Sequence, residues 1–73
     1  MISKETINYV YNRIKELAED GYLEITSWDS LTDLFYSNKS SLKIAFKDLE
    51  DRGKIKREYG FHSKLIGIRV LGD

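Results

Sequence analysis

Three lysines recur at intervals of four residues in a segment that has the pattern of a helix. Lys39, Lys43 and Lys47 stand at positions i, i+4 and i+8, along one flank of an α-helix. Like charges at this spacing repel each other at a cost of about 0.2–0.5 kcal/mol per pair. A polyanion lying along the helix would offset this repulsion. The lysines therefore indicate binding of a negatively charged polymer, with a solvated basic face as the alternative.

The helix that carries these lysines is predicted to end near Arg52, before Gly53. One side is apolar at the i, i+3, i+4, i+7 spacing of a buried helical face: Leu42, Ala45, Phe46 and Leu49. The amino-terminal residues of a helix that enters the major groove of DNA meet base edges. We therefore expect base contacts from Ser40, Ser41, Lys43 and Ile44, and phosphate contacts from Lys39 and Lys47.

A second basic segment follows this helix. Over residues 54–59 two sets alternate at period two, as in a strand: Ile55, Arg57 and Tyr59 against Lys54, Lys56 and Glu58. A second strand is predicted at 65–71 after a loop at 60–63. In the second strand Ile66, Ile68 and Val70 are expected to share one face. The hairpin offers further candidates for contact with nucleic acid: Lys54, Lys56, Arg57, His62, Lys64 and Arg69.

Aromatic residues are interleaved with these bases. Tyr59 is expected to pack on the first helix. Phe61 has two open interpretations: it closes the loop, or it stacks on a base, an interaction worth about 1–3 kcal/mol per base in single-strand binders. The remaining large aromatic residues are expected to complete the core or to cover a dimer contact along the first helix: Tyr9, Tyr11, Tyr22 and Trp28.

The chain is predicted to begin with a helix and a short strand. Ser3 is a suitable N-cap for a first helix that runs to about Asp20. Gly21 stands just past that end, where glycine adopts left-handed backbone at little cost. Residues 22–25 then form a short extended piece.

A second, short helix is predicted after Thr26 or Ser27, either of which is a suitable N-cap. The spacing T-S-W-D puts Asp29 at the acidic position of a capping box. The buried side of this helix is expected to consist of Leu31, Leu34 and Phe35. The following turn contains Ser37 and Asn38, and asparagine tolerates left-handed backbone there.

Size and composition limit the classes of protein that fit. Seventy-three residues, 41% of them hydrophobic and 33% charged, predict a single folded domain over residues 1–73. The chain has no cysteine, which excludes disulfides and thiolate metal sites and fits a cytoplasmic location. No apolar run has the length of a signal peptide or a membrane span, so no membrane partner is expected.

The sequence lacks the residue combinations that are typical of enzyme active sites. His62 is the only histidine, with no cysteine to join it in a metal site, and no glycine-rich phosphate-binding motif occurs. Asp48 and Asp51 form an acidic pair on the exposed part of a helix, without the burial typical of a general acid or base. We therefore expect no enzyme activity, no metal and no cofactor.

Charge is divided unevenly along a chain whose formal net charge is zero. Three basic and seven acidic side chains give residues 1–37 a charge of −4, and nine basic and five acidic ones give residues 38–73 a charge of +4. This division predicts a positive face on an otherwise acidic body.

The predicted order is helix, short strand, helix, turn, helix and hairpin. Two segments carry a resemblance to a known family: LKIAFKDLEDRGKI at 42–55 and IGIRVL at 66–71, the latter with Gly67-Ile68-Arg69. The chain resembles winged helix-turn-helix DNA-binding domains, and within them it is most similar to the amino-terminal domain of LexA-type repressors. It departs from them in a turn without glycine at 36–38, and in Ile44, where relatives have a polar residue.

The resemblance implies an α+β winged helix-turn-helix fold, with three helices and a carboxy-terminal hairpin as the wing. It also implies DNA binding. The first hypothesis is a sequence-specific transcription regulator on duplex DNA, acting as a possible homodimer. The alternatives are a replication accessory protein that binds single-stranded DNA through the wing, and a protein-interaction module in which Ile44 and the tyrosines meet another protein. The composition is typical of an AT-rich bacterial or mobile-element genome.

Overall fold

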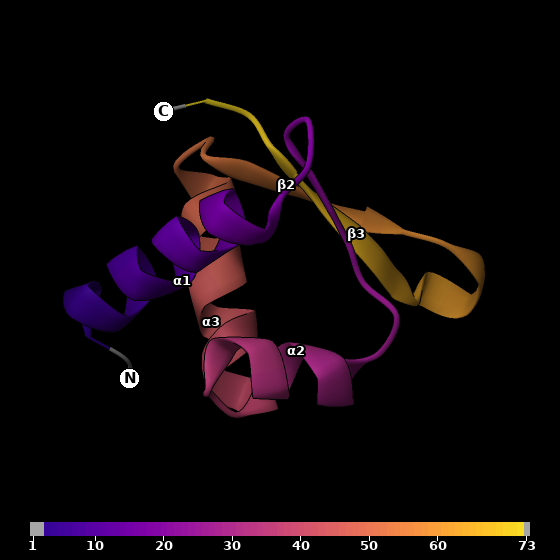
Figure 1. Ribbon diagram of the computed structural model, residues 1–73, viewed down its shortest axis with the longest axis horizontal. Coiled ribbons are helices and arrows are strands. Elements are labelled where there is room, and N and C mark those ends of the chain that lie inside the picture. Colours follow the sequence, from indigo (N-terminus) through magenta and orange to yellow (C-terminus); the bar gives the residue numbers. More distant parts are fainter. Residues whose placement is uncertain (1–2, 73) are drawn as a thin grey trace.

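The computed structural model describes residues 3–72, and over these residues the chain forms three helices and a three-stranded antiparallel sheet (Figure 1). Residues 1, 2 and 73 of the predicted domain lie outside the described residues. The elements in chain order are α1 (Lys4–Leu17), β1 (Tyr22–Glu24), α2 (Trp28–Phe35), α3 (Lys39–Asp51), β2 (Ile55–Tyr59) and β3 (Leu65–Val70). The predicted α+β class and the predicted order of elements are confirmed.

The sheet has the strand order β1-β3-β2, so the last strand lies in the middle. Figure 1 shows α2 lying at the amino-terminal end of α3, while the β2–β3 hairpin reaches away from the helices. A short helical turn, η1 (Phe61–Ser63), joins the two strands of the hairpin. The hairpin and the exposed side of α3 therefore border the same open region of the molecule.

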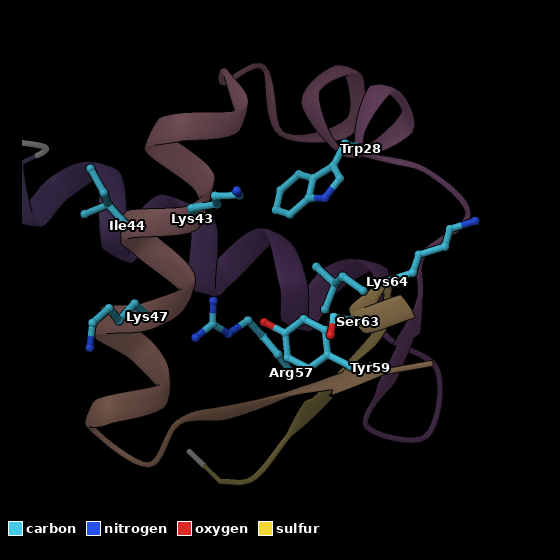
Figure 2. Close-up of a pocket in the computed structure, with 9 residues that line it drawn as sticks. Trp28, Lys43, Ile44, Lys47, Arg57, Tyr59, Ser63 and Lys64 are labelled. Atoms are coloured by element: carbon cyan, nitrogen blue, oxygen red, sulfur yellow. The ribbon is translucent and has the colours of Figure 1, made fainter. Parts of the chain in front are cut away.

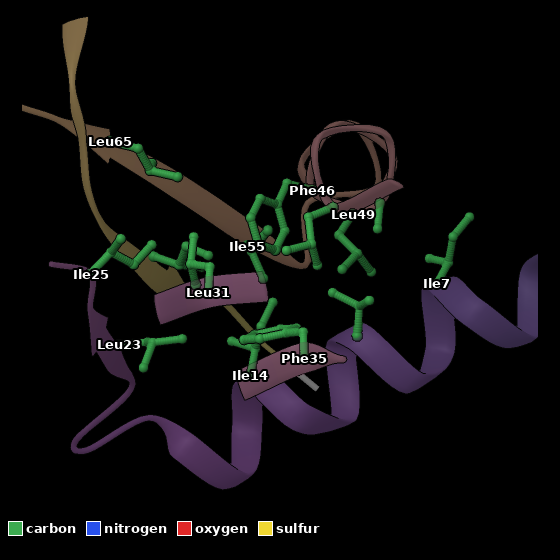
Figure 3. Close-up of a cluster of buried hydrophobic side chains, with 14 residues drawn as sticks. Ile7, Ile14, Leu23, Ile25, Leu31, Phe35, Phe46, Leu49, Ile55 and Leu65 are labelled. Atoms are coloured by element: carbon green, nitrogen blue, oxygen red, sulfur yellow. The ribbon is translucent and has the colours of Figure 1, made fainter. Parts of the chain in front are cut away.

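The hydrophobic core lies between the helices and the inner face of the sheet (Figure 3). The predicted apolar side of α3 is buried, which confirms Leu42, Ala45, Phe46 and Leu49 as its members. Phe46 also meets Phe35 of α2 edge to face, with ring centroids 6.1 Å apart. This packing sets the position of α3, and with it the direction of the exposed lysines.

Helix α1 ends earlier than the sequence predicted. Ser3 caps it as expected, because its hydroxyl accepts a hydrogen bond from the Thr6 N–H. The helix stops at Leu17, however, and Gly21 does not terminate it. Asp20 and Gly21 have φ of 54° and 78°, and form a tight turn closed by hydrogen bonds between Glu19 and Tyr22. The glycine therefore serves the turn into β1.

Helix α2 is capped by Ser27, whose hydroxyl accepts from the Ser30 N–H at 3.2 Å. Ser30 thus holds the third helical position, and the prediction that Asp29 completes a capping box is wrong by one residue. Leu31 and Phe35 are buried as predicted. Leu34 is 37% exposed, and its expected burial is wrong as well.

In the turn between α2 and α3, the left-handed backbone is not at Asn38, where the sequence suggested it. Tyr36 has the left-handed backbone, with φ of 52°. Asn38 is extended and caps α3, its side-chain oxygen accepting from the Ser41 N–H at 2.8 Å. Capping satisfies one of the free N–H groups of α3, which explains why asparagine holds this position.

Strand β3 contains an irregularity that the alternating pattern did not predict. Glu58 pairs with Gly67, but Tyr59 pairs with Leu65, so Ile66 has no partner of its own on β2. The extra residue reverses the alternation of side chains. Leu65 and Ile68 are both buried, and Ile66 is exposed, which corrects the prediction that Ile66 and Ile68 share a face.

Candidate nucleic-acid interface

The exposed side of α3 carries the residues that the sequence predicted there. The side chains of Lys39, Ser40, Lys43, Ile44 and Lys47 are exposed, and Ser41 is half-buried at the cap. The apolar Ile44 is 46% exposed in the middle of this basic side. Lys47 lies 3.2 Å from Asp51, but both side chains are largely in solvent, where such a pair adds little stability and leaves the lysine available.

Trp28, at the start of α2, contacts the lysines of α3. The ammonium groups of Lys39 and Lys43 lie 5.2 and 5.8 Å from the centroid of the indole ring. The ring also packs on Phe46, with centroids 6.2 Å apart. A cation over an aromatic face is attracted by the ring quadrupole. Trp28 therefore holds two lysines of α3 over an aromatic surface.

Glu50 fastens the hairpin to α3. Its Oε1 accepts from Arg57 Nη2 at 2.8 Å and from Nε at 3.2 Å, and its Oε2 accepts from the Arg57 backbone N–H at 3.0 Å. The hydrogen bonds from the Arg57 side chain lower the pKa of the Glu50 carboxyl below its usual value of 4.5. Because β2 is an edge strand, the carboxylate also occupies an N–H group that would otherwise be open.

A cleft of about 600 Å³ opens between α3 and the hairpin (Figure 2). Lys43, Ile44 and Lys47 form one side of it. The hairpin forms the other side with Arg57, Tyr59, Ser63, Lys64 and Leu65, and Trp28 closes one end. Among these described lining residues four are basic and none is acidic. The arrangement provides an apolar hollow with cations around it.

The prediction that Tyr59 packs on the first helix is wrong. Its side chain is 52% exposed and lines the cleft opposite Trp28 (Figure 2).

The other large aromatic residues lie in different parts of the fold. Tyr11 and Trp28 pack against the core, Tyr22 lies over Gly67 on the sheet, and Tyr9 is largely exposed.

Five of the predicted basic residues do not line the cleft: Lys39, Lys54, Lys56, His62 and Arg69. Lys56 and Arg69 are paired across β2 and β3, and both are on the outer face of the sheet, which faces away from α3. Arg69 is placed over the Tyr22 ring at 5.2 Å and lies 3.5 Å from Glu58. Lys54 is half-buried, with its ammonium group 5.9 Å from the Tyr11 ring of α1.

The tip of the hairpin presents an aromatic side chain to solvent. Phe61 is 92% exposed and therefore does not close the loop. His62 and Ser63 follow it with φ of 58° and 57°, a left-handed backbone that costs non-glycine residues energy. A hydrogen bond from the Gly60 N–H to the Lys64 carbonyl, at 2.8 Å, closes the loop instead. Phe61 and His62 are thus held at the far end of the hairpin.

Five residues of this site were not among the sequence-predicted candidates: Trp28, Glu50, Tyr59, Ser63 and Leu65. Trp28 and Tyr59 were expected to have structural roles. No local pattern links Glu50 to Arg57, because their contact depends on the hairpin folding back onto the helix. An aromatic residue at the first position of α2 was the one available signal for Trp28.

Comparison of the chain with protein-family models, with curated proteins and with solved structures found no match in any of the three. None of the helices within residues 3–72 is long and apolar enough to cross a membrane. The same residues contain no cluster of three or more histidine or carboxylate side chains that could hold a metal ion.

Proposed function

We propose that this chain is a DNA-binding protein of the winged helix-turn-helix class, which inserts α3 into the major groove and sets the β2–β3 hairpin on the adjacent backbone. The element order and the β1-β3-β2 sheet are compatible with that class. Ser40, Lys43 and Ile44 would then meet base edges, Ile44 against a thymine methyl group. Lys39 and Lys47 would contact phosphates.

The observation that carries this proposal is the convergence of cations from two separate segments. Lys43 and Lys47 come from the helix and Arg57 and Lys64 from the hairpin, and all four line one cleft without an acidic neighbour among the described lining residues. Neutralisation of phosphates by lysine and arginine is the main source of affinity for DNA. Lys47 and Arg57 also have carboxylate partners, Asp51 and Glu50, neither of which lines the cleft.

The biological role proposed is sequence-specific regulation of transcription. An exposed helix side with hydroxyl, apolar and basic groups offers the mixed contacts that discriminate base pairs. A homodimer would bind two half-sites about 34–36 Å apart, one helical turn of DNA.

A titration of labelled duplex DNA at several salt concentrations tests the proposal. A protein that binds phosphates gives a linear fall of log K with log salt, with a slope of about −0.9 for each phosphate neutralised. Selection from a random duplex pool should also enrich one sequence. A flat salt dependence would exclude DNA binding and favour the protein-interaction module. Salt-dependent binding without enrichment would exclude sequence reading.

Phe61 favours a second candidate function, binding of single-stranded DNA. An aromatic ring that is 92% exposed beside His62 and Lys64 has the chemistry of a base-stacking platform. This candidate predicts tighter binding to an oligonucleotide than to its duplex, and a large loss of single-strand affinity in Phe61→Ala. If Phe61→Ala leaves single-strand affinity unchanged, this candidate is wrong.

A further inference from the structure

The cleft between α3 and the hairpin contains aromatic and apolar side chains in addition to the cations that would neutralise phosphates. Trp28 and Tyr59 stand on opposite sides of it, with Ile44 and Leu65 among the apolar lining residues (Figure 2). Phosphate contacts alone do not require the aromatic rings. At about 600 Å³ the cleft falls within the roughly 300–1,000 Å³ range of small-molecule sites.

We propose that this cleft accepts one unpaired nucleobase of a bound DNA strand, stacked on the aromatic rings of Trp28 and Tyr59, with the flanking phosphates on Lys43 and Lys64. This inference rests on the proposed DNA-binding function and adds the form of DNA that is preferred.

Charge and shape together select this occupant. A nucleotide has a flat apolar face that stacks on aromatic rings, and a phosphate on each side that attracts cations. The lining offers both, since its basic residues surround the apolar ones. The hydroxyl groups of Tyr59 and Ser63 also face the cleft and are suitable partners for the polar edge of a base (Figure 2).

The Lys43 contact with Trp28 connects the two parts of the site. Its ammonium group lies 5.8 Å from the indole centroid, so a base on the ring and a phosphate on the lysine would be neighbours. Glu50 keeps the hairpin side in place by holding Arg57, which lines the same cleft. The hairpin side of the cleft is therefore formed before a ligand binds, and Lys43 moves off the indole face when a base stacks there.

An intact duplex does not supply such a base without cost, because its bases are paired and stacked. Extracting a base from a duplex requires the free energy of unpairing, which is smallest for a base that is already unpaired. We therefore expect a duplex with a single-thymine bulge to bind about tenfold more tightly than the intact duplex, within the range that stacking on an aromatic ring supports. The same bulge without its base should lack this advantage.

Trp28 is the only tryptophan in the chain, so its fluorescence reports on the cleft directly. The experiment titrates the full chain with three duplexes: intact, bulged with one thymine, and bulged with an abasic nucleotide. Binding is followed by anisotropy of the labelled DNA and by Trp28 emission. The expected result is tenfold tighter binding and quenching of Trp28 with the thymine bulge only.

The variant Tyr59→Ala tests the opposite wall without disturbing Trp28, which packs against the core. It should reduce the preference for the thymine bulge over the intact duplex to less than about twofold. Tyr9→Ala is the matched control, since Tyr9 is 42% exposed on α1, outside the cleft lining, and should leave the preference unchanged.

The outcomes separate the two proposals. Equal binding of all three duplexes with constant Trp28 emission would overturn the cleft assignment and leave DNA binding in place. Failure to bind any of them would overturn both. Quenching of Trp28 by an acidic peptide, but by none of the duplexes, would assign the cleft to a protein partner and also overturn the inference.

Discussion

The sheet has basic side chains on both of its faces, and the two faces use them in different ways. On the outer face Arg69 lies over the Tyr22 ring and 3.5 Å from Glu58. On the side of the cleft, Arg57 and Lys47 are paired with Glu50 and Asp51, whereas neither Lys43 nor Lys64 has a carboxylate within salt-bridge distance among residues 3–72. Their side chains surround an open hollow instead.

Equal charge therefore does not imply equal function. A cation that already has a carboxylate and an aromatic partner gains little from a phosphate, because it must exchange one favourable contact for another. A cation at the rim of the cleft without a carboxylate partner among the described residues, such as Lys64, exchanges only water for a phosphate. Arg69 therefore stabilises the outer face of the sheet, and under the proposed function the cleft is the surface that meets DNA.

The largest expected effect follows from removing the cations of α3. The double substitution Lys43→Ala and Lys47→Ala should weaken duplex binding about 100-fold, because the interaction of each lysine with a base or phosphate contributes about 1–2 kcal/mol. The slope of log K against log salt should become shallower by about 0.9, since Lys47 contacts a phosphate and Lys43 a base edge. Anisotropy titrations at several salt concentrations measure both quantities.

The control for this experiment lies on the outer face. Lys56→Ala with Arg69→Ala removes the same formal charge and should change duplex affinity by less than about threefold, since only the long-range field is altered. If the two double variants weaken binding equally, the two faces do not differ in function.

The next effect concerns the outer face itself. A Cβ atom on Gly67 would lie 1.9 Å from the Tyr22 hydroxyl oxygen and 2.3 Å from the ring carbon that bears it. Gly67→Ala should therefore displace the ring and lower the free energy of unfolding by about 2 kcal/mol, a typical cost of overpacking. Urea denaturation measures the loss, and affinity for DNA should stay unchanged.

Tyr22→Ala provides the matched background. In that variant the obstructing ring is absent, so the further substitution Gly67→Ala should cost less than about 0.5 kcal/mol. An equal cost in both backgrounds would contradict the contact with Tyr22 as the reason for glycine.

A smaller effect is expected where the hairpin joins α3. Glu50→Gln should lower the free energy of unfolding by about 1–2 kcal/mol at neutral pH, because it weakens charge-assisted hydrogen bonds in a partly exposed pair. The folded-state pKa of Glu50 is lowered, chiefly by the Arg57 side chain. Its contribution to stability is therefore complete above the ordinary pKa of 4.5 and is lost as the pH falls through the folded-state pKa.

Urea denaturation of both proteins between pH 7 and pH 3 measures this dependence. The stability difference between wild type and Glu50→Gln should stay constant above the ordinary pKa and narrow below it. Glu58→Gln is the control on the outer face, and we expect it to cost less than about 0.5 kcal/mol at neutral pH. A Glu50→Gln difference that does not vary with pH would refute the proposed ionisation.

The smallest effect is expected at Asp51. Asp51→Asn should change the free energy of unfolding by less than about 0.5 kcal/mol, because its pair with Lys47 is exposed. It should nevertheless tighten duplex binding about twofold at low salt, since a negative charge beside α3 is removed, and this gain should vanish at high salt. Unchanged affinity at low salt would indicate that Asp51 lies outside the field of the bound DNA.

Local patterns were sufficient to predict α3. Its apolar residues recur at helical spacing, and Gly53 follows directly after its end, so both its extent and its buried side follow from nearest neighbours. The same holds for the cap at Ser3. The exposure of Lys39, Lys43 and Lys47 was predicted for the same reason, because residues opposite a buried stripe face solvent.

Contacts between distant segments were not predictable in this way. Ile66 follows the alternation of its strand, yet it is exposed because the pairing of Tyr59 with Leu65 leaves it unpaired. The alternation in β2 separates Lys56 from Arg57, but it does not say which of them faces α3. Placement of Tyr59 in the cleft depends on the same choice.

The amino-acid order was thus enough for the helices, the strands and the uneven distribution of charge, since these depend on residues close together in the chain. The cleft exists only after folding, because Trp28, Lys43 and Tyr59 come from three elements that the core brings together. The bond between Glu50 and Arg57 then sets how far the hairpin lies from the helix, and a bond across seven residues has no signature in local periodicity.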